Sequence, residues 1–372
     1  MSAASTQPTA EGRELLEAAR EGNEDAFRRL VEPHRNELHA HCYRMLGSLH
    51  DAEDALQDTL LRAWRALSGF EGRSSLRSWL YRIATNSSLN AIERRPKRVL
   101  PVDYGPATDP HGGPGEPVVE SVWVEPYPDE QLGVEDGYAA PESRYERRES
   151  VELAFIAALQ HLPAKQRAVL ILRDVLGFSA KEAADTLATT AAAVNSALQR
   201  ARAKVEERLP EQSQQATLRS LGDEGLREVV EGYVEAWDRG DVDAVVTRLA
   251  EDAAFAMPPL RTWFRGREAI AIFLAGWPLS GEWRWRHLPA RANGQPALAF
   301  YAWDADERSY LPFALNVLTI RGARISDVTA FVTRSIELPD PGVYARWPEQ
   351  PADPRRTTAI FERFGLPDQL PA

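Results

Sequence analysis

Residues 178–187 read FSAKEAADTL and are followed by the turn ATT at 188–190 and by AAAVNSALQRARAKVEE at 191–207. Ser179 and Glu182 have the spacing of a capping box, and Thr190 is a good N-cap for a second helix. Apolar residues recur every three to four positions after Thr190, which predicts a helix with one buried side. Together these signals predict a helix-turn-helix.

In a helix-turn-helix, the first turns of the second helix enter the major groove, and basic residues further along lie near phosphates. The candidate DNA-contacting residues are therefore Thr190, Ala192, Asn195, Ser196, Gln199, Arg200 and, on the phosphate side, Arg202. An ordinary helical hairpin with solvated arginines has a similar pattern and remains an alternative for this segment taken alone.

A second basic stretch lies at residues 71–98. From Arg73 to Arg98 it holds seven basic residues and one acid, although the whole 372-residue chain has a formal charge of -11. Local positive charge within an acidic protein favours a dedicated surface for a polyanion such as DNA. Trp79 is an exception, because its helical spacing beside apolar neighbours is typical of a core residue.

The preceding segment, DAEDALQDTLLRAW at residues 51–64, predicts an acidic helix with an apolar stripe. An acidic helix is repelled by DNA phosphates, so we expect it to face a protein.

Three segments now carry a family resemblance: residues 51–64, SSLRSWLYRIATN at 74–86 and LPAKQRAVL at 162–170. Their sequences and order resemble bacterial extracytoplasmic-function (ECF) RNA polymerase sigma factors. The resemblance covers roughly residues 13–209.

The resemblance implies two partners, core RNA polymerase and promoter DNA, which bind different segments of the chain. The acidic helix would bind the polymerase clamp helices through Asp51, Asp54, Gln57, Asp58, Leu61 and Trp64. The loop and helix from residue 70 to 95 would read and open the −10 element through Arg73, Ser74, Asn86, Asn90 and Arg94. The second helix of the helix-turn-helix would read the −35 element.

Residues 99–148 read as a linker. Residues 101–150 hold twelve acids and three bases among many prolines and glycines, a composition that does not build its own core. In related sigma factors the corresponding loop threads through the polymerase channel. An acidic strand that mimics nucleic acid there and a plain solubilising spacer are both open. VWVEPYP at 122–128 differs, because Trp123, Pro126 and Tyr127 are typical of a docking segment that would regulate the protein.

The residues after 211 predict a further domain. Helical patterns at 226–239, 242–249 and 267–274 precede strand-like runs at 283–288, 296–303, 313–321 and 325–332, with another strand expected at 252–259. This order predicts an α+β cone around a cavity. The motif YVEAWDRGD at 233–241 and the element order resemble SnoaL-like proteins of the ketosteroid-isomerase superfold.

Catalysis in that fold needs an acid or base in an apolar cavity. The candidates are Asp252, His287, Asp304 and Asp306. Asp252 also reads as a turn residue and Asp304 as part of a hairpin tip, so we expect no enzyme and no catalytic residue. A cyclase- or isomerase-type enzyme, or a ligand sensor, fused to a DNA-binding module is the alternative. The many aromatic residues suit either a small apolar ligand or an interface with the sigma modules.

The remaining sequence features concern cofactors, metals and the location of the protein. Cys42 is the only cysteine, and His39 and His41 cannot share a helix face, so we expect no cofactor and no metal. No signal peptide or long apolar run is present, which favours the bacterial cytoplasm over a membrane.

The expected fold class is thus two all-α helical modules, the second with a helix-turn-helix, plus a C-terminal α+β domain. The expected boundaries are 13–98, 99–148, 149–209, 222–338 and a tail at 339–372, whose aromatic pair, Phe361 and Phe364, would dock on the body. We expect the C-terminal domain and the linker to hold the sigma modules in a compact or an open arrangement.

Overall fold

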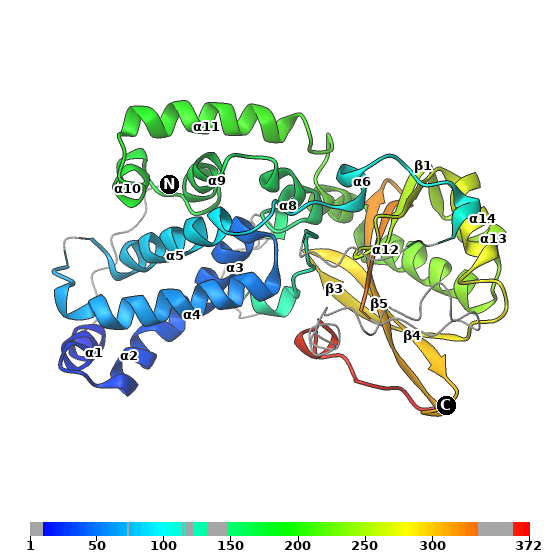
Figure 1. Ribbon diagram of the computed structural model, residues 1–372, viewed down its shortest axis with the longest axis horizontal. Helices are drawn as coiled ribbons and strands as arrows, with labels where there is room; N and C mark the ends of the chain where they lie inside the picture. Colours follow the sequence, from blue (N-terminus) through cyan, green and yellow to red (C-terminus); the bar gives the residue numbers. More distant parts are fainter. Residues whose placement is uncertain (1–9, 73, 114, 116–121, 133–147, 334–359) are drawn as a thin grey trace. The chain divides into compact units, whose positions relative to one another are not determined.

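The computed structural model describes residues 10–72, 74–113, 115, 122–132, 148–333 and 360–372. They divide into two compact units. The first comprises the chain up to Arg98 together with residues 131–209, and the second comprises residues 99–130 together with the chain from Pro210 onward. The first unit is helical and the second contains a sheet with helices (Figure 1). The expected fold class is confirmed.

The first helical module has α3 at its centre. Its helices are α1 (Ala10–Arg20), α2 (Glu24–Val31), α3 (Arg35–Leu46), α4 (Leu49–Ala66) and α5 (Leu76–Glu93). Nine consecutive residues of α3, from Leu38 to Leu46, are buried, because α4 and α5 pack on it from the same module. Trp79 is buried and its ring lies 5.0 Å from that of Phe70, which confirms the core role predicted for Trp79.

The second helical module contains the helix-turn-helix. Its elements are α8 (Leu153–Gln160), α9 (Ala164–Leu170), a π-helical turn (Ile171–Val175), α10 (Ala180–Thr186) and α11 (Ala191–Glu206). The predicted capping box forms, because the Ser179 N–H donates to Glu182 Oε2 at 2.8 Å and the Glu182 N–H donates to Ser179 Oγ at 3.2 Å. Thr190 Oγ1 accepts from the Ala193 N–H at 3.2 Å, so the predicted N-cap of α11 is also confirmed.

The second unit is built on a six-stranded mixed sheet with the order β2-β1-β6-β5-β4-β3. The strands are β1 (Leu249–Ala256), β2 (Trp263–Arg265), β3 (Trp285–Ala292), β4 (Gln295–Asp304), β5 (Ser309–Arg321) and β6 (Arg324–Val332). The predicted four-strand meander is present as antiparallel β3 to β6. Strand β2 was not predicted, because it is too short for a period-2 pattern, and neither was the parallel pairing of β1 with β6.

Three helices pack on the sheet: α12 (Gln214–Asp238), α13 (Val242–Thr247) and α14 (Arg267–Gly276). Helix α12 starts twelve residues before the predicted Leu226 and is interrupted at Gly222, which has φ +70°. The motif at 233–241 has a structural role here. Tyr233 and Trp237 are buried in the core, and Asp241 caps α13 by accepting from the Ala244 N–H at 2.9 Å.

The predicted linker does not stand alone, because residues 99–130 belong to the second unit. They contain the short helix α6 (Pro101–Tyr104) and two 3-10 turns, η3 (Pro110–Gly112) and η4 (Asp129–Leu132), the last of which continues past the end of this segment. Val102 packs against the small cluster formed by Ala254, Ala256 and Trp263 on β1 and β2. Through Val102 this segment therefore packs on the sheet of the second unit.

The described part of the tail, residues 360–372, also docks on the second unit. The ring of Phe361 is 1% exposed and lies 5.2 Å from that of Tyr301, and Phe364 is buried as well. The docking predicted for this aromatic pair is confirmed.

His41 is fully buried in α3. Its Nε2 lies 2.9 Å from Thr85 Oγ1 of α5, and burial lowers the pKa of His41 to about 3. Between pH 6.5 and about 3 the unfolded chain therefore takes up a proton at His41 that the folded chain does not. Stability from this group is complete above pH 6.5 and declines as the pH falls.

We predict that replacing His41 by Gln removes the part of the loss of stability at low pH that His41 causes. Each pH unit within the window costs the wild-type protein about 1.4 kcal/mol of unfolding free energy through His41. Urea unfolding of the first unit at pH 6.5 and 5.5 should thus show a smaller pH effect in His41→Gln than in the wild type. Equal pH effects in both proteins would contradict the assignment, whatever the absolute stability of the variant.

Candidate functional site

The second helix of the helix-turn-helix presents a polar face to solvent. The exposed residues on α11 include Ala192, Asn195, Ser196, Gln199, Arg200 and Arg202, and its N-cap Thr190 is exposed as well. Val194, Leu198 and Ala201 are buried on the other side of the helix. The structure therefore brings all seven candidates for reading the −35 element onto exposed positions at one helix.

Two arginines of this face already have intramolecular partners. Arg200 donates to Ser196 Oγ at 2.6 Å. Arg202 donates two hydrogen bonds to the carboxylate of Asp174, at 2.8 and 2.6 Å, and this contact raises the pKa of Arg202. A phosphate must therefore compete with Asp174 for Arg202. The same ion pair joins α11 to the π-helical turn, because Asp174 belongs to that turn.

The candidates for the −10 element lie on or beside α5. Asn86, Asn90 and Arg94 are exposed along the C-terminal half of the helix and its C-cap. Ser74 is exposed just before the helix, whose N-cap is Ser75. Arg73 lies outside the described residues.

Helix α4 carries the candidates for polymerase binding. Gln57 and Asp54 are exposed. Leu61 is 55% exposed and is one of two large apolar residues of the described chain whose side chains face solvent. Asp58 pairs with Arg62 at 2.9 Å, and the half-buried Trp64 packs on Phe27 with ring centres 5.1 Å apart.

Asp51 differs from the other residues of this group because it is only 3% exposed. Its carboxylate forms ion pairs with Arg95 and Arg98, and Arg98 is itself 5% exposed. In this structure Asp51 therefore fastens the end of the first module rather than facing a partner. The same ion pairs partly neutralise the basic run after α5. The sequence did not predict them, because Asp51 precedes Arg95 and Arg98 by more than 40 residues.

The docking segment of the linker is buried. Trp123, Pro126 and Tyr127 are all buried, and Trp123 lies 5.2 Å from the Tyr104 ring. The Tyr127 N–H donates to Asn293 Oδ1 at 2.9 Å, and the Asn293 N–H donates to the Tyr127 carbonyl at 2.8 Å. The segment is thus held by the turn between β3 and β4.

The same turn holds two further segments. Gly294 donates its N–H to Asp129 Oδ1 at 2.7 Å, and Asp129 also pairs with Arg291 at 3.3 Å. The Gly294 carbonyl accepts from Gln215 Nε2, at the start of α12, at 2.7 Å. Asn293 and Gly294 have φ angles of +57° and +70°, as a tight hairpin turn requires.

We call Tyr127, Asp129, Gln215, Asn293 and Gly294 the turn cluster. Of these residues, only Tyr127 was predicted from the sequence to have a functional role. An Asn-Gly pair between two strand-like runs is a hairpin signal, but nothing local to it shows which segments will bind there.

A narrow apolar cavity of about 30 Å³ lies inside the second unit. It is lined mainly by aromatic and aliphatic side chains. Two of its lining groups, Asn316 Oδ1 and Trp277 Nε1, are buried without a hydrogen-bond partner in the described chain.

None of the four candidate catalytic residues lines this cavity. Asp252 is exposed and forms an ion pair with Arg321, while Asp304 accepts the N–H groups of Asp306 and Glu307 at a hairpin tip. His287 lies 3.5 Å from Asp238, and burial lowers the pKa of His287.

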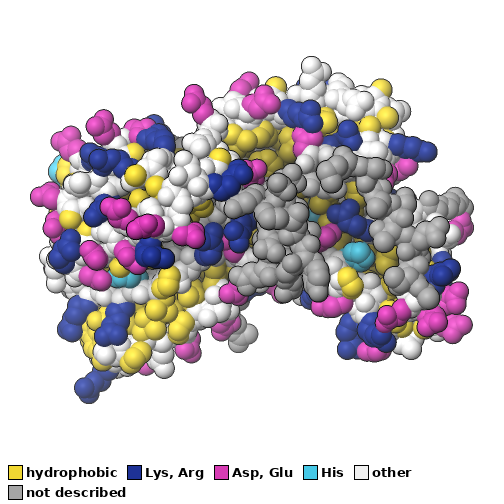
Figure 2. All heavy atoms as spheres, turned by 180° about the vertical axis from the view of Figure 1, so that it is seen from behind, with side chains coloured by type: hydrophobic (Ala, Val, Ile, Leu, Met, Phe, Trp, Pro, Cys, Tyr) yellow, Lys and Arg dark blue, Asp and Glu magenta, His cyan; other side chains and the backbone are white. Residues whose placement is uncertain are grey.

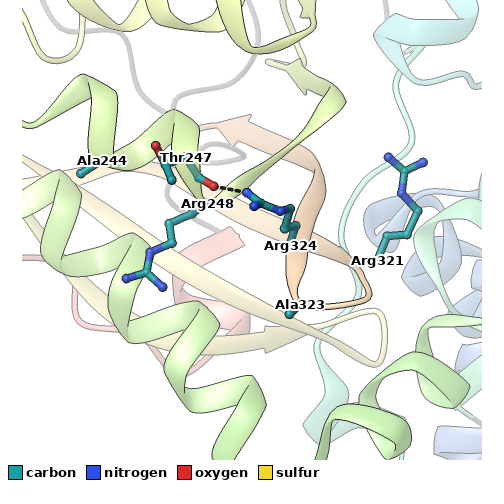
Figure 3. A pocket seen from close by; sticks show the side chains of 6 residues that line it. All are labelled: Ala244, Thr247, Arg248, Arg321, Ala323 and Arg324. Carbon is teal, nitrogen blue, oxygen red and sulfur yellow. Dashed lines mark hydrogen bonds between the residues drawn. The ribbon is translucent and has the colours of Figure 1, made fainter.

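A wider cleft of about 520 Å³ opens near α13 and the turn between β5 and β6 (Figure 3). Its charged lining residues are Arg248, Arg321 and Arg324. Figure 3 shows that Arg248 and Arg321 point away from each other, while Arg324 donates to the Thr247 carbonyl. The guanidinium groups do not converge on one point. Acidic and basic side chains are also interspersed on the face of the molecule seen in Figure 2.

Within the described residues no group of three or more His, Cys, Asp or Glu side chains is placed to hold a metal. No described helix is both long and apolar enough to cross a bilayer.

Comparison with known proteins identifies the modules. The family described as Sigma-70 region 2 matches residues 30–98, Sigma-70 region 4 matches residues 152–205, and the SnoaL-like domain matches residues 230–334.

The chain is 42% identical over 342 residues to the ECF RNA polymerase sigma factor SigG of Mycobacterium tuberculosis, which covers 91% of this chain and 84% of that protein. It is 30% identical over 189 residues to SigE of Mycolicibacterium smegmatis, covering 50% of this chain and 62% of that protein. The crystal structure of SigJ of M. tuberculosis has the same fold, with a TM-score of 0.50, 21% identity and coverage of 80% of this chain and 93% of that one. The chain therefore belongs to the ECF family of RNA polymerase sigma factors and carries a C-terminal SnoaL-like domain.

Proposed function

We propose that this sigma factor directs promoter-specific initiation through three helices and that its SnoaL-like domain restrains that activity. Helix α11 would read the −35 element, α5 the −10 element, and α4 would contact core RNA polymerase. The restraint would act through the turn cluster, where the linker and the start of α12 are both bound. The restraint is supported above all by these two attachments to one turn.

For the −35 element, Asn195 and Gln199 are the side chains best suited to base edges. Both amides are exposed on α11 within three turns of its N-terminus, and an amide can form paired hydrogen bonds with adenine. Lys204 is exposed further along the helix and suits a phosphate.

We predict that Gln199→Ala relaxes base preference at one position of the −35 element, while Lys204→Ala weakens binding to every sequence about equally. Loss of an amide-base contact costs about 1–3 kcal/mol of discrimination, whereas loss of a phosphate contact lowers the slope of log affinity against log salt by about 1. Holoenzyme binding to a promoter library at two salt concentrations separates the two effects. A uniform loss in both variants would remove Gln199 from the reading set.

For the −10 element, we propose Ser74, Asn86, Asn90 and Arg94 as the contacts, with Arg73 kept as a prediction from the sequence. Asn86, Asn90 and Arg94 follow one another at four-residue spacing, so they form one polar stripe on α5.

For polymerase binding, we propose Asp54, Gln57, Asp58, Leu61 and Trp64, without Asp51. Leu61 is the apolar centre of this group, and covering an exposed leucine contributes about 1–2 kcal/mol to association. The cytoplasm is the location that these partners require.

We predict that Leu61→Asp weakens binding to core RNA polymerase at least tenfold, since it places a charge where an apolar contact forms. Arg227→Asp is the control, because it introduces the same side chain at an exposed position of α12. This variant should bind core polymerase like the wild type. Titration of fluorescent protein with core polymerase measures both. Wild-type affinity in Leu61→Asp would exclude this helix face from the interface.

The proposed restraint follows from chain connectivity. With residues 99–130 docked, no residue intervenes between Arg98, the end of the first module, and the second unit. Only residues 210–213 separate Leu209 from α12, whose Gln214 side chain is fixed to the backbone of Ile320 at 2.7 and 2.8 Å. At about 3.5 Å per residue, these connections keep the ends of sigma regions 2 and 4 within a few tens of ångströms. If the linker is released, regions 2 and 4 are connected by a free segment of 50 residues, from 99 to 148.

We predict that Asn293→Gly raises initiation. Glycine tolerates the positive φ of this position but removes the side-chain acceptor of the Tyr127 N–H, a loss of about 1 kcal/mol that shifts docking about fivefold. Ala323→Gly, in the turn between β5 and β6, is the matched control and should leave initiation unchanged. Transcription from a promoter library at limiting sigma factor measures the effect. Unchanged or lower initiation by Asn293→Gly would argue against the restraint.

We further propose that the SnoaL-like domain is not catalytic and that its cavity serves a small apolar ligand carrying one polar group. The unpartnered Asn316 and Trp277 groups support the ligand, and the positions of Asp252, His287 and Asp304 outside the lining argue against acid-base chemistry. At about 30 Å³ the cavity must widen before a molecule larger than water fits.

A further inference from the structure

Arg202 lies on the same side of α11 as the two amides proposed to read bases. Asn195, Gln199 and Arg202 follow one another at spacings of four and three residues, so they form one exposed stripe along the helix. In a helix-turn-helix the first turns of this helix enter the major groove, and a basic residue further along lies near the phosphates that border the groove. By its position alone, Arg202 would therefore contact a phosphate.

The guanidinium of Arg202 is already bound by a carboxylate. Its Nε donates to Asp174 Oδ2 at 2.8 Å, and its Nη2 donates to Asp174 Oδ1 at 2.6 Å. Two nitrogens thus meet two oxygens, which is the paired geometry that arginine also uses on a phosphate. The carboxylate occupies the donors that a phosphate would need.

A second acid lies close to the same arginine, whereas the lysine of this helix has none. The hydrogen bonds to Asp174 are the main cause of the raised pKa of Arg202, and the charge of Glu206, four residues further along α11, adds to it. Lys204 is exposed and forms no ion pair within the described part of the chain. The two cations therefore differ, because Lys204 is available to a phosphate and Arg202 is held by an acid.

Helix stability does not explain Asp174. This residue lies one position before the end of the π-helical turn that continues α9. The carbonyl groups at the C-terminal end of a helix carry partial negative charge, which disfavours a carboxylate there. The side chains of the pair are also 54% exposed for Arg202 and 30% exposed for Asp174, and exposed ion pairs contribute little to folding. The clearest effect of Asp174 is on the charge that α11 presents to DNA.

We propose that Asp174 withholds Arg202 from the DNA backbone and thereby lowers the sequence-independent affinity of α11 for duplex DNA. This role rests on the proposed function of α11 at the −35 element. A phosphate could take Arg202 only by leaving the Asp174 carboxylate unpaired beside it, and two like charges at that distance repel each other. The ion pair therefore persists when DNA binds, and Lys204 supplies the phosphate contact instead.

The consequence is weaker binding to DNA that contains no promoter. Each phosphate contact releases counterions and strengthens binding to any duplex, whatever its sequence. A genome offers about a million or more such non-specific sites. One more phosphate contact would hold more of the factor on these sites and leave less of it for core RNA polymerase. Asp174 thus limits non-specific binding without touching a base.

A double-mutant cycle between Asp174 and Arg202 tests this role. Binding of the full-length holoenzyme to a promoter selected from the library is measured from about 50 to 200 mM salt. Asp174→Asn keeps the size of the side chain and removes its charge, so we expect it to steepen the slope of log affinity against log salt by about 1. Arg202→Ala should leave the slope of the wild type unchanged. In the Asp174→Asn protein the same substitution should abolish the added slope.

Two further variants serve as references. Asp223→Asn makes the same chemical change at an exposed position of α12, outside region 4, and should bind DNA like the wild type. Lys204→Ala should lower the slope by about 1 with or without Asp174, because its phosphate contact does not depend on that residue. All of the substituted side chains are exposed, so the variants keep the packing of the helices.

Three results would overturn the proposal. The first is an unchanged slope in Asp174→Asn. The second is a lower slope when Arg202→Ala is made in the wild type, because Arg202 would then reach a phosphate despite Asp174. The third is a slope that stays steep in the double variant, which would assign the effect to repulsion between Asp174 and DNA.

The Lys204→Ala variant distinguishes failure of this role from failure of the proposed function. If Lys204→Ala lowers the slope and Asp174→Asn does not steepen it, α11 lies on DNA and only the role of Asp174 is wrong. If neither variant changes the slope, α11 does not contact the DNA backbone, and its role at the −35 element fails together with that of Asp174.

Discussion

The turn formed by Asn293 and Gly294 is the point on which the organisation of this sigma factor depends. Its backbone and one side chain bind Tyr127 and Asp129 of the linker, and its carbonyl binds Gln215 at the start of α12. The chain enters the SnoaL-like domain from region 2 through the linker and from region 4 through α12. One two-residue turn therefore fixes both connections, although it belongs to neither sigma region.

In the proposed restraint, the turn cluster limits the separation of the two sigma regions through short connections. Its hydrogen bonds, each worth about 0.5–1.5 kcal/mol net, act together with the burial of Trp123 and Tyr127 in the same segment.

The sequence predicted what local periodicity and capping determine. The capping box of Ser179 and Glu182, the N-cap Thr190 and the meander from β3 to β6 were all readable, because each depends on residues close in the chain. The burial of Asp51 was not, since its partners Arg95 and Arg98 follow a different helix. The same holds for the turn cluster, which joins segments separated by about 80 to 170 residues. The DNA-facing and polymerase-facing assignments came from motif resemblance, and the structure adds which of those side chains are exposed.

Hydrogen–deuterium exchange of the linker, with and without core polymerase, would show whether the turn cluster releases the linker when the polymerase binds. We predict slow exchange at the amides of Val124, Tyr127, Asn293 and Gly294 in the free protein, because each donates a hydrogen bond within the second unit. We also predict that Tyr127 and Gly294 lose protection in a holoenzyme that initiates transcription. Full protection of these amides in an active holoenzyme would show that the linker stays docked during initiation and that its release plays no part in activity.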